Sequence, residues 1–266
     1  MKSLVNTKSL FGNVPDIFAR KIRKWKCLEN RKNSTFLIID DKDGHLGLYP
    51  LSLDFNVTVY EPNKNFIHGG VIEIPVSIPN SNEYVYLKRN CMGILDRARL
   101  QFKEDNLVVY NRNFYEIDNF NKYDYVCACK SLDREENKNY SLEFKIDKLK
   151  KAVKEDGYLY LEYYIALDDK NTEKYPINEF LRKDEIVNYF DKKEWTIMSD
   201  EVKIIDNYLT PINRNNEKVL IGYLDVRKRP VNVPKIRKNS VNKRIDFNSD
   251  KEVKCTRKYI INGVIR

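Results

Sequence analysis

Glycine is scarce in this sequence, with 9 among 266 residues, and long apolar runs are missing. No stretch of 18 or more apolar residues occurs, so no membrane-spanning helix is expected. The first residues also lack the continuous apolar core of a signal peptide. The five cysteines are scattered and odd in number, which argues against a disulfide framework. These absences predict a reduced, cytoplasmic protein with no membrane partner.

Histidine is rarer still, since only His45 and His68 occur, and neither is predicted to be catalytic. Cys127 and Cys129 alternate in an apolar stretch and therefore point to the same face of a predicted strand. A Cys-x-Cys pair without nearby histidines is a weak metal signal. Small buried side chains are the favoured interpretation of this pair, and no metal site is predicted.

Excess positive charge is absent from most of the chain and concentrated at its end. Residues 227–266 hold 13 Lys and Arg against 3 Asp and Glu, whereas residues 1–226 hold 35 against 36. The region 229–266 has little apolar periodicity and is predicted to be an extended basic tail. Such a tail suits nucleic acid or an acidic protein partner, and a solubilising end is the alternative.

The rest of the chain alternates between strand-like and helix-like segments. A helix is predicted after Pro15 and a β-hairpin over about 69–89, around the turn cluster Pro-Asn-Ser-Asn. Strands are predicted near 35–40, 57–60, 123–132, 158–167, 195–204 and 218–228, and residues 106–117 are predicted to hold a further strand with its following loop. Helices are predicted near 45–54, 90–106, 144–157 and 181–194. This alternation predicts βαβ units and a mostly parallel sheet.

The stretch LIIDDKDGHLGLYPLSLDFNVTVYEPN, residues 37–63, reads as strand, turn, helix and second strand. The turn follows a buried strand, and Glu61 comes 17 positions after Gly44, where the second strand ends. A nucleotide site of the Rossmann type begins in this way, because a carboxylate at that strand end accepts hydrogen bonds from ribose hydroxyls.

With these segments in this order, residues 9–228 resemble class I S-adenosylmethionine-dependent methyltransferases, nearest the tellurite- and thiopurine-resistance branch. FGNVPDIFARKI resembles the helix that precedes the core in that branch, and LKKAVKEDGYLYLEYY resembles its helix, glycine turn and fifth strand. The resemblance implies a Rossmann-like α/β fold: a mostly parallel seven-stranded sheet with helices on both faces, here with a hairpin insertion.

The resemblance also implies a cofactor, S-adenosylmethionine, and residues that would contact it. Glu61 would bind the ribose, Asn113 would face the adenine amino group, and Phe114 would cover the ring. Asp40 and Gly44 belong to the loop beside the cofactor's amino-acid part, and Cys129, at the end of the fourth strand, would border the cofactor. No catalytic residue is predicted, because a soft sulfur or a neutral amine can attack the methyl group without a general base. The enzyme then mainly aligns the attacking atom with the methyl group.

The sequence departs from the family at the glycine loop, Asp40-Asp41-Lys42-Asp43-Gly44. If Gly44 is the last glycine of the motif, Asp40 and Lys42 replace the others; a register shifted by two makes Asp40 the strand-end acid. The spacing to Glu61 favours the first register. Glycines in such loops allow a close approach of the ligand and unusual torsions, so their replacement leaves two hypotheses open.

The first hypothesis is a methyltransferase whose substrate is unidentified, with a small molecule favoured. The alternative is a catalytically lapsed methyltransferase fold that serves as a binding or structural subunit through its basic tail. In either case the predicted organisation is a helical cap (1–35), a Rossmann-like domain (36–228) and the tail (229–266).

Overall fold

The structure, a computed structural model, describes residues 9–29, 33–77, 84–101, 103–165, 184–205 and 219–230. Contacts divide the chain into two units, residues 1–14 with 33–229, and residues 15–32 with 230–266. In the second unit the described residues form the predicted helix α1 (Asp16–Glu29), whose Phe18, Ile22 and Trp25 side chains are buried. The predicted tail beyond Pro230 lies outside the described residues. No helix among the described residues is long and apolar enough to cross a membrane.

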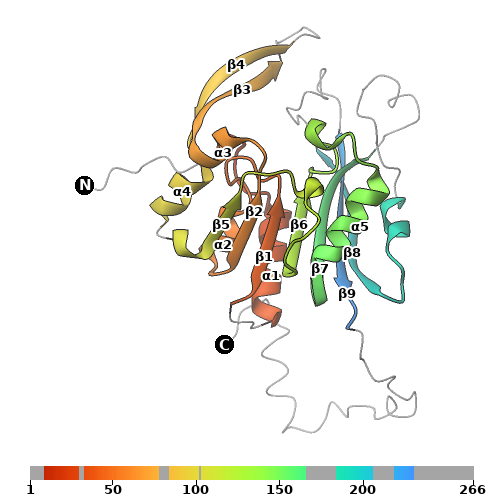
Figure 1. Ribbon diagram of the computed structural model, residues 1–266. Helices are drawn as coiled ribbons and strands as arrows, with labels where there is room; N and C mark the ends of the chain where they lie inside the picture. Colours follow the sequence, from red (N-terminus) through yellow and green to blue (C-terminus); the bar gives the residue numbers. More distant parts are fainter. Residues whose placement is uncertain are drawn as a thin grey trace, which may run out of the picture. The chain divides into compact units, whose positions relative to one another are not determined.

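A seven-stranded sheet forms the centre of the first unit (Figure 1). Its strands are β1 (Thr35–Ile39), β2 (Asn56–Tyr60), β5 (Leu107–Tyr110), β6 (Tyr123–Cys129), β7 (Val153–Ile165), β8 (Trp195–Ile205) and β9 (Val219–Lys228). They lie in the order β5-β2-β1-β6-β7-β9-β8. The direction of β9 is opposite to that of the other six strands, so its pairings with β7 and β8 are antiparallel. The predicted, mostly parallel sheet is therefore confirmed.

Helices cover both faces of this sheet. The described helices of the first unit are α2 (Leu48–Ser52), α3 (Lys64–His68), α4 (Ile94–Leu100) and α5 (Leu142–Ala152), with short 3-10 turns at Glu104–Asn106, Phe114–Glu116, Glu135–Asn137 and Ile186–Tyr189. On one face, Ile146 and Leu149 of α5 share a buried cluster with Leu37 and Leu159. On the other side α2 contacts β2 and α4. Parallel strands enclosed in this way must be apolar on both faces, as the buried run at Phe36–Ile39 is.

The predicted hairpin consists of β3 (Gly70–Ser77) and β4 (Tyr84–Cys91), which pair with each other as a separate two-stranded sheet. Figure 1 shows this hairpin projecting beyond the helices α3 and α4 that flank it in sequence. Its predicted turn, residues 79–82, lies outside the described residues. At its base Gly69 has a left-handed φ of 83°, and a side chain at Gly93 would collide with the carbonyl oxygen of Ile67.

Two helices differ from the sequence prediction. Helix α5 ends at Ala152 instead of continuing to Gly157, and β7 begins at once with Val153, which pairs with Tyr123. Gly157 lies within β7, where a side chain would come within 2.9 Å of the Asp124 carbonyl oxygen. Its glycine therefore permits close strand pairing rather than ending a helix. In the predicted helix 181–194, the described residues form only the 3-10 turn Ile186–Tyr189.

Candidate functional site

The loop after β1 has left-handed backbone torsions at alternate residues. Asp40, Lys42 and Gly44 have φ values of 60°, 58° and 81°. Glycine takes such torsions without strain, whereas a lysine side chain disfavours them by about 1–2 kcal/mol. These are the three positions that the first sequence register assigns to the family's glycines. The backbone of a glycine loop is thus retained although two of the glycines are not.

Two buried aspartates hold this loop in place. Asp41 accepts hydrogen bonds from the backbone N–H groups of Leu46 (2.8 Å) and Gly47 (2.9 Å), just before α2. Asp43 accepts the Ser9 hydroxyl at 2.6 Å and pairs with Arg97 at 3.4 Å. These bonds replace interactions with water that burial removes, because an unpaired buried carboxylate is costly. The loop conformation therefore rests on its own side chains.

Glu61 follows the last residue of β2 and is 0% exposed. Its Oε2 atom accepts the Lys42 N–H at 2.8 Å, and its Oε1 atom accepts the Asn63 N–H at 3.0 Å. The carboxylate thus faces the loop after β1, as the sequence predicts. Parallel strands end at the same edge of the sheet, and ligands of open α/β sheets bind outside that edge.

Arg134 lies on the two predicted acidic residues of this edge. Its Nη1 atom donates to Glu61 Oε2 at 3.2 Å and is 3.6 Å from Asp40 Oδ1. A third carboxylate, that of Glu136, pairs with Arg134 Nε at 3.3 Å. A guanidinium presents several donors in a fixed plane and so serves several carboxylates at once.

Asn137 joins the same site from the neighbouring turn. Its amide nitrogen donates to Asp40 Oδ2 at 2.7 Å, and its amide oxygen accepts from Asn113 Nδ2 at 2.9 Å. Asn113 also caps the turn Phe114–Glu116, because its Oδ1 atom accepts the Tyr115 N–H at 2.9 Å. Asp40, Glu61 and Asn113, three predicted site residues, are thus brought together by two residues of one segment.

Burial dominates the electrostatics of this edge. It raises the pKa of Asp40 to about 7, although Arg134 lowers it, and it raises the pKa of Glu61 as well. Burial also lowers the pKa of Lys42 to about 8, assisted by the positive charge of Arg134. A site in which charges are poorly hydrated interacts strongly with an incoming charged ligand.

The structure places the other predicted site residues differently. Phe114 is 0% exposed and packs in the core against Tyr60, with ring centroids 5.4 Å apart. Cys129 ends β6 in register with Glu162 of β7, and burial raises the pKa of its thiol. Glu162 is itself buried and accepts the Tyr160 hydroxyl at 3.1 Å. The ligand contacts assigned to Phe114 and Cys129 stay predictions.

Sequence reasoning missed Arg134 and Asn137. Both follow β6 in the run Asp-Arg-Glu-Glu-Asn-Lys-Asn, residues 133–139, in which every side chain is polar. Such a run reads as a solvated loop. Yet Asn137 is 0% exposed, and the Arg134 side chain is 15% exposed. Their position after a strand that ends at the ligand edge was the one available signal.

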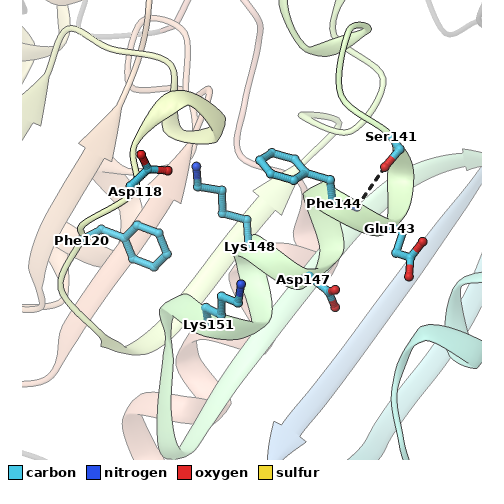
Figure 2. Close-up of a pocket in the computed structure, with 8 residues that line it drawn as sticks. All are labelled: Asp118, Phe120, Ser141, Glu143, Phe144, Asp147, Lys148 and Lys151. Atoms are coloured by element: carbon cyan, nitrogen blue, oxygen red, sulfur yellow. Dashed lines mark hydrogen bonds between the residues drawn. The ribbon is translucent and has the colours of Figure 1, made fainter.

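A surface hollow of about 350 Å³ lies elsewhere, beside α5. Figure 2 shows Phe120 and Phe144 on opposite sides of Lys148, with Asp118 and Lys151 nearby. Lys148 Nζ donates to the Tyr115 carbonyl at 2.6 Å, so a structural contact already occupies it. None of the residues that line this hollow belongs to the predicted cofactor site.

The sequence matches no protein-family model, and no curated protein matches it. Solved structures similar to the chain include TehB from Haemophilus influenzae, at 15% identity and a TM-score of 0.54, with 79% of this chain and 62% of TehB covered. YcgJ from Bacillus subtilis has 10% identity and a TM-score of 0.55, with 82% of this chain and all of YcgJ covered.

A SAM-dependent methyltransferase from Methanosarcina mazei has 12% identity and a TM-score of 0.50, with 82% of this chain and 99% of that protein covered. This chain has the methyltransferase fold. At these identities the likeness concerns the fold, and the sequence-based prediction of a Rossmann-like methyltransferase architecture with a hairpin insertion is confirmed. The chain spans less than two thirds of the length of TehB.

Proposed function

We propose that this protein binds S-adenosylmethionine at the carboxyl ends of β1, β2 and β6 and transfers its methyl group to a small molecule. The supporting observation is Glu61, a fully buried carboxylate at the end of β2 that faces the loop after β1. In the methyltransferase fold this position suits the two ribose hydroxyls, which need an acceptor-only partner.

The residues of the edge fit the parts of this cofactor. Glu61 would accept the ribose hydroxyls, and the left-handed loop Asp40–Gly44 would lie beside the amino-acid part. Asn113 would offer its amide to the adenine edge once Asn137 is removed from it. The cofactor supplies an electrophilic methyl group on a sulfonium, so the chain has to align the acceptor and exclude water. Cys129, the last residue of β6, and the buried Glu162 beside it on β7 would border that acceptor.

The proposal is tested by calorimetric titration of the full chain with S-adenosylmethionine and S-adenosylhomocysteine. Glu61→Gln keeps the size of the side chain and removes the acceptor charge. We expect micromolar binding to the wild-type protein and a loss of tenfold or more in Glu61→Gln, about 1.4 kcal/mol. Exposed Glu143→Gln is the matched control and should bind normally. Equal affinity of Glu61→Gln and wild type would contradict the assigned site.

Methyl transfer is tested separately with cofactor that carries a labelled methyl group. Small thiols and neutral amines are the acceptors to try first, because they need no general base. Transfer to one of them that Glu61→Gln slows would support an enzyme. Tight cofactor binding with no transfer to any acceptor tried would leave a binding protein.

A second candidate is a lapsed methyltransferase fold that acts as a binding subunit. One observation favours it: Arg134 and Asn137 already bind the acceptors that a nucleoside would need. The basic tail would then contact nucleic acid or an acidic protein. Retention on heparin and on RNA, measured with and without residues 231–266, tests this candidate. Retention that falls with salt and disappears with the tail would support it.

A further inference from the structure

The segment Asp133–Asn139 reproduces the polar contacts that a bound nucleoside would make. Arg134 donates to Glu61, where the ribose hydroxyls would donate. Asn137 presents an amide to Asn113, where the adenine edge would lie. Both residues also bind Asp40 at the start of the loop. One short segment thus satisfies the acidic and amide groups from the ends of three strands.

We propose that residues 133–139 are a built-in competitor for the nucleotide site, which must leave Glu61 and Asn113 before the cofactor binds. The inference rests on the proposed function and adds its regulation. The measured affinity for cofactor would then reflect the free energy of cofactor binding minus the free energy needed to displace residues 133–139. A mutation that removes the contacts of Arg134 or Asn137 with the site should therefore strengthen binding.

The two occupants exclude each other because Glu61 has few free positions. Its Oε1 atom already accepts the Asn63 N–H, and its Oε2 atom accepts both Lys42 N–H and Arg134 Nη1. A ribose diol requires both oxygens, so it cannot bind while Arg134 stays. The cofactor also carries a positive sulfonium, which a guanidinium at the same edge would repel.

The composition of the segment allows it to leave. Between Leu132 and Tyr140 no apolar side chain occurs, so the segment carries no hydrophobic side chain of its own into water when it leaves. Its hydrogen bonds would be exchanged for bonds to water, so the net cost is much smaller than the gross bond energy and is largest for the bonds of Arg134 to carboxylates. The buried carboxylates that it uncovers are the costly part, and the ligand's own donors would compensate them.

Fixed points on both sides limit the movement to this segment. Before it, the Leu132 carbonyl accepts the Lys145 ammonium at 2.7 Å, and Leu132 is 3% exposed. After it, Ser141 caps α5 by accepting the Phe144 N–H at 3.2 Å, and the Tyr140 ring stacks on Phe144. The ends thus stay in place while Arg134 and Asn137 exchange with the ligand.

The test is calorimetric titration of Arg134→Gln and Asn137→Ala with S-adenosylmethionine, beside the wild type. We expect the affinity to rise about tenfold in Arg134→Gln, because hydrogen bonds to charged groups are the stronger ones. Lys138→Ala is the matched control, since it removes an exposed cation from the same segment. Circular dichroism confirms that each variant is folded.

Hydrogen exchange of the wild-type protein gives a second measurement. Adding S-adenosylhomocysteine should speed exchange at residues 133–139 and slow it at Asp40–Gly44. Slower hydrogen exchange of residues 133–139 on binding would overturn the proposal that they compete with the ligand, because the segment would then close over it. So would a wild type that binds while Arg134→Gln binds equally or more weakly. If no variant binds, the proposed function fails, and this inference fails with it.

Discussion

At the scale of the residue, the loop after β1 shows how a glycine motif survives the loss of its glycines. Asp40 and Lys42 keep the left-handed torsions of the positions they occupy. Aspartate tolerates this region better than lysine, because its short polar side chain can bond locally. Lys42 gains a contact with the Phe11 ring, 4.2 Å from its Nζ atom. The cost of the left-handed backbone torsion at Lys42 can be separated from this contact by substitution.

Replacing Lys42 by glycine or by alanine isolates that strain. Both variants lose the contact with Phe11, but only glycine relaxes the backbone. We expect Lys42→Gly to exceed Lys42→Ala in free energy of unfolding by about 1 kcal/mol, after the freedom of unfolded glycine is subtracted. The measurement is denaturant unfolding. The same pair at Asp147, within α5, should show the opposite order. An alanine variant as stable as the glycine variant would show that no strain is stored.

Asp41 makes stability depend on pH. Burial raises its pKa to about 8, against the hydrogen bonds from Leu46 and Gly47. In the unfolded chain the group has an ordinary pKa near ~4, so the folded state holds a proton that the unfolded state releases. Stability is therefore lost as pH rises, until it passes the folded pKa of about 8. The neighbouring carboxyl of Asp40, with a pKa of about 7, acts in the same direction.

The effect of the buried aspartates on stability is best measured between pH 6.5 and 8. Two other loop groups act outside it, since the pKa of His45 is lowered to about 4 and that of Lys42 to about 8. We expect the free energy of unfolding to fall by about 1–2 kcal/mol across this window. Asp41→Asn should flatten the fall, whereas exposed Glu143→Gln should not. An unchanged slope in Asp41→Asn would contradict a proton on Asp41.

At the scale of the element, α5 fixes where the segment 133–139 can move. Its first residue follows the cap Ser141, and its buried face meets the cluster under β6 and β7. The sequence predicts this helix from its apolar spacing, yet places its end five residues too late. The pairing of Val153 with Tyr123 overrides helix propensity there, and a tertiary contact of this kind leaves no local pattern.

Removal of the cap tests that boundary. Ser141→Ala should destabilise the protein by about 1 kcal/mol, because the Phe144 N–H loses its acceptor. Ser141→Asp should restore the loss, since a carboxylate also accepts this bond and favours the positive end of the helix. Thermal unfolding measures both variants. If Ser141→Ala left the melting temperature unchanged, the cap would not anchor the segment.

At the scale of the whole molecule, the sequence predicted the mostly parallel sheet but not the order of its strands. The alternation of strands and helices indicated the parallel sheet, and the spacing from Gly44 drew attention to Glu61, whose role in binding stays a prediction. Arg134 and Asn137 were not predictable, because their partners lie 73 and 97 positions earlier in the chain. Polar side chains carry no periodicity, so only the fold reveals which of them are enclosed.

The hairpin β3–β4 offers a reference position outside the segment 133–139. Its base is closely packed, because a side chain at Gly93 would collide with the Ile67 carbonyl oxygen and the Gly69 backbone nitrogen. Tyr86, 64% exposed on β4, is a natural position for a spectroscopic probe. A paired probe at exposed Lys138 would convert any movement of residues 133–139 into a change of energy transfer. The hairpin thus supplies a reference position against which a displacement of residues 133–139 can be measured.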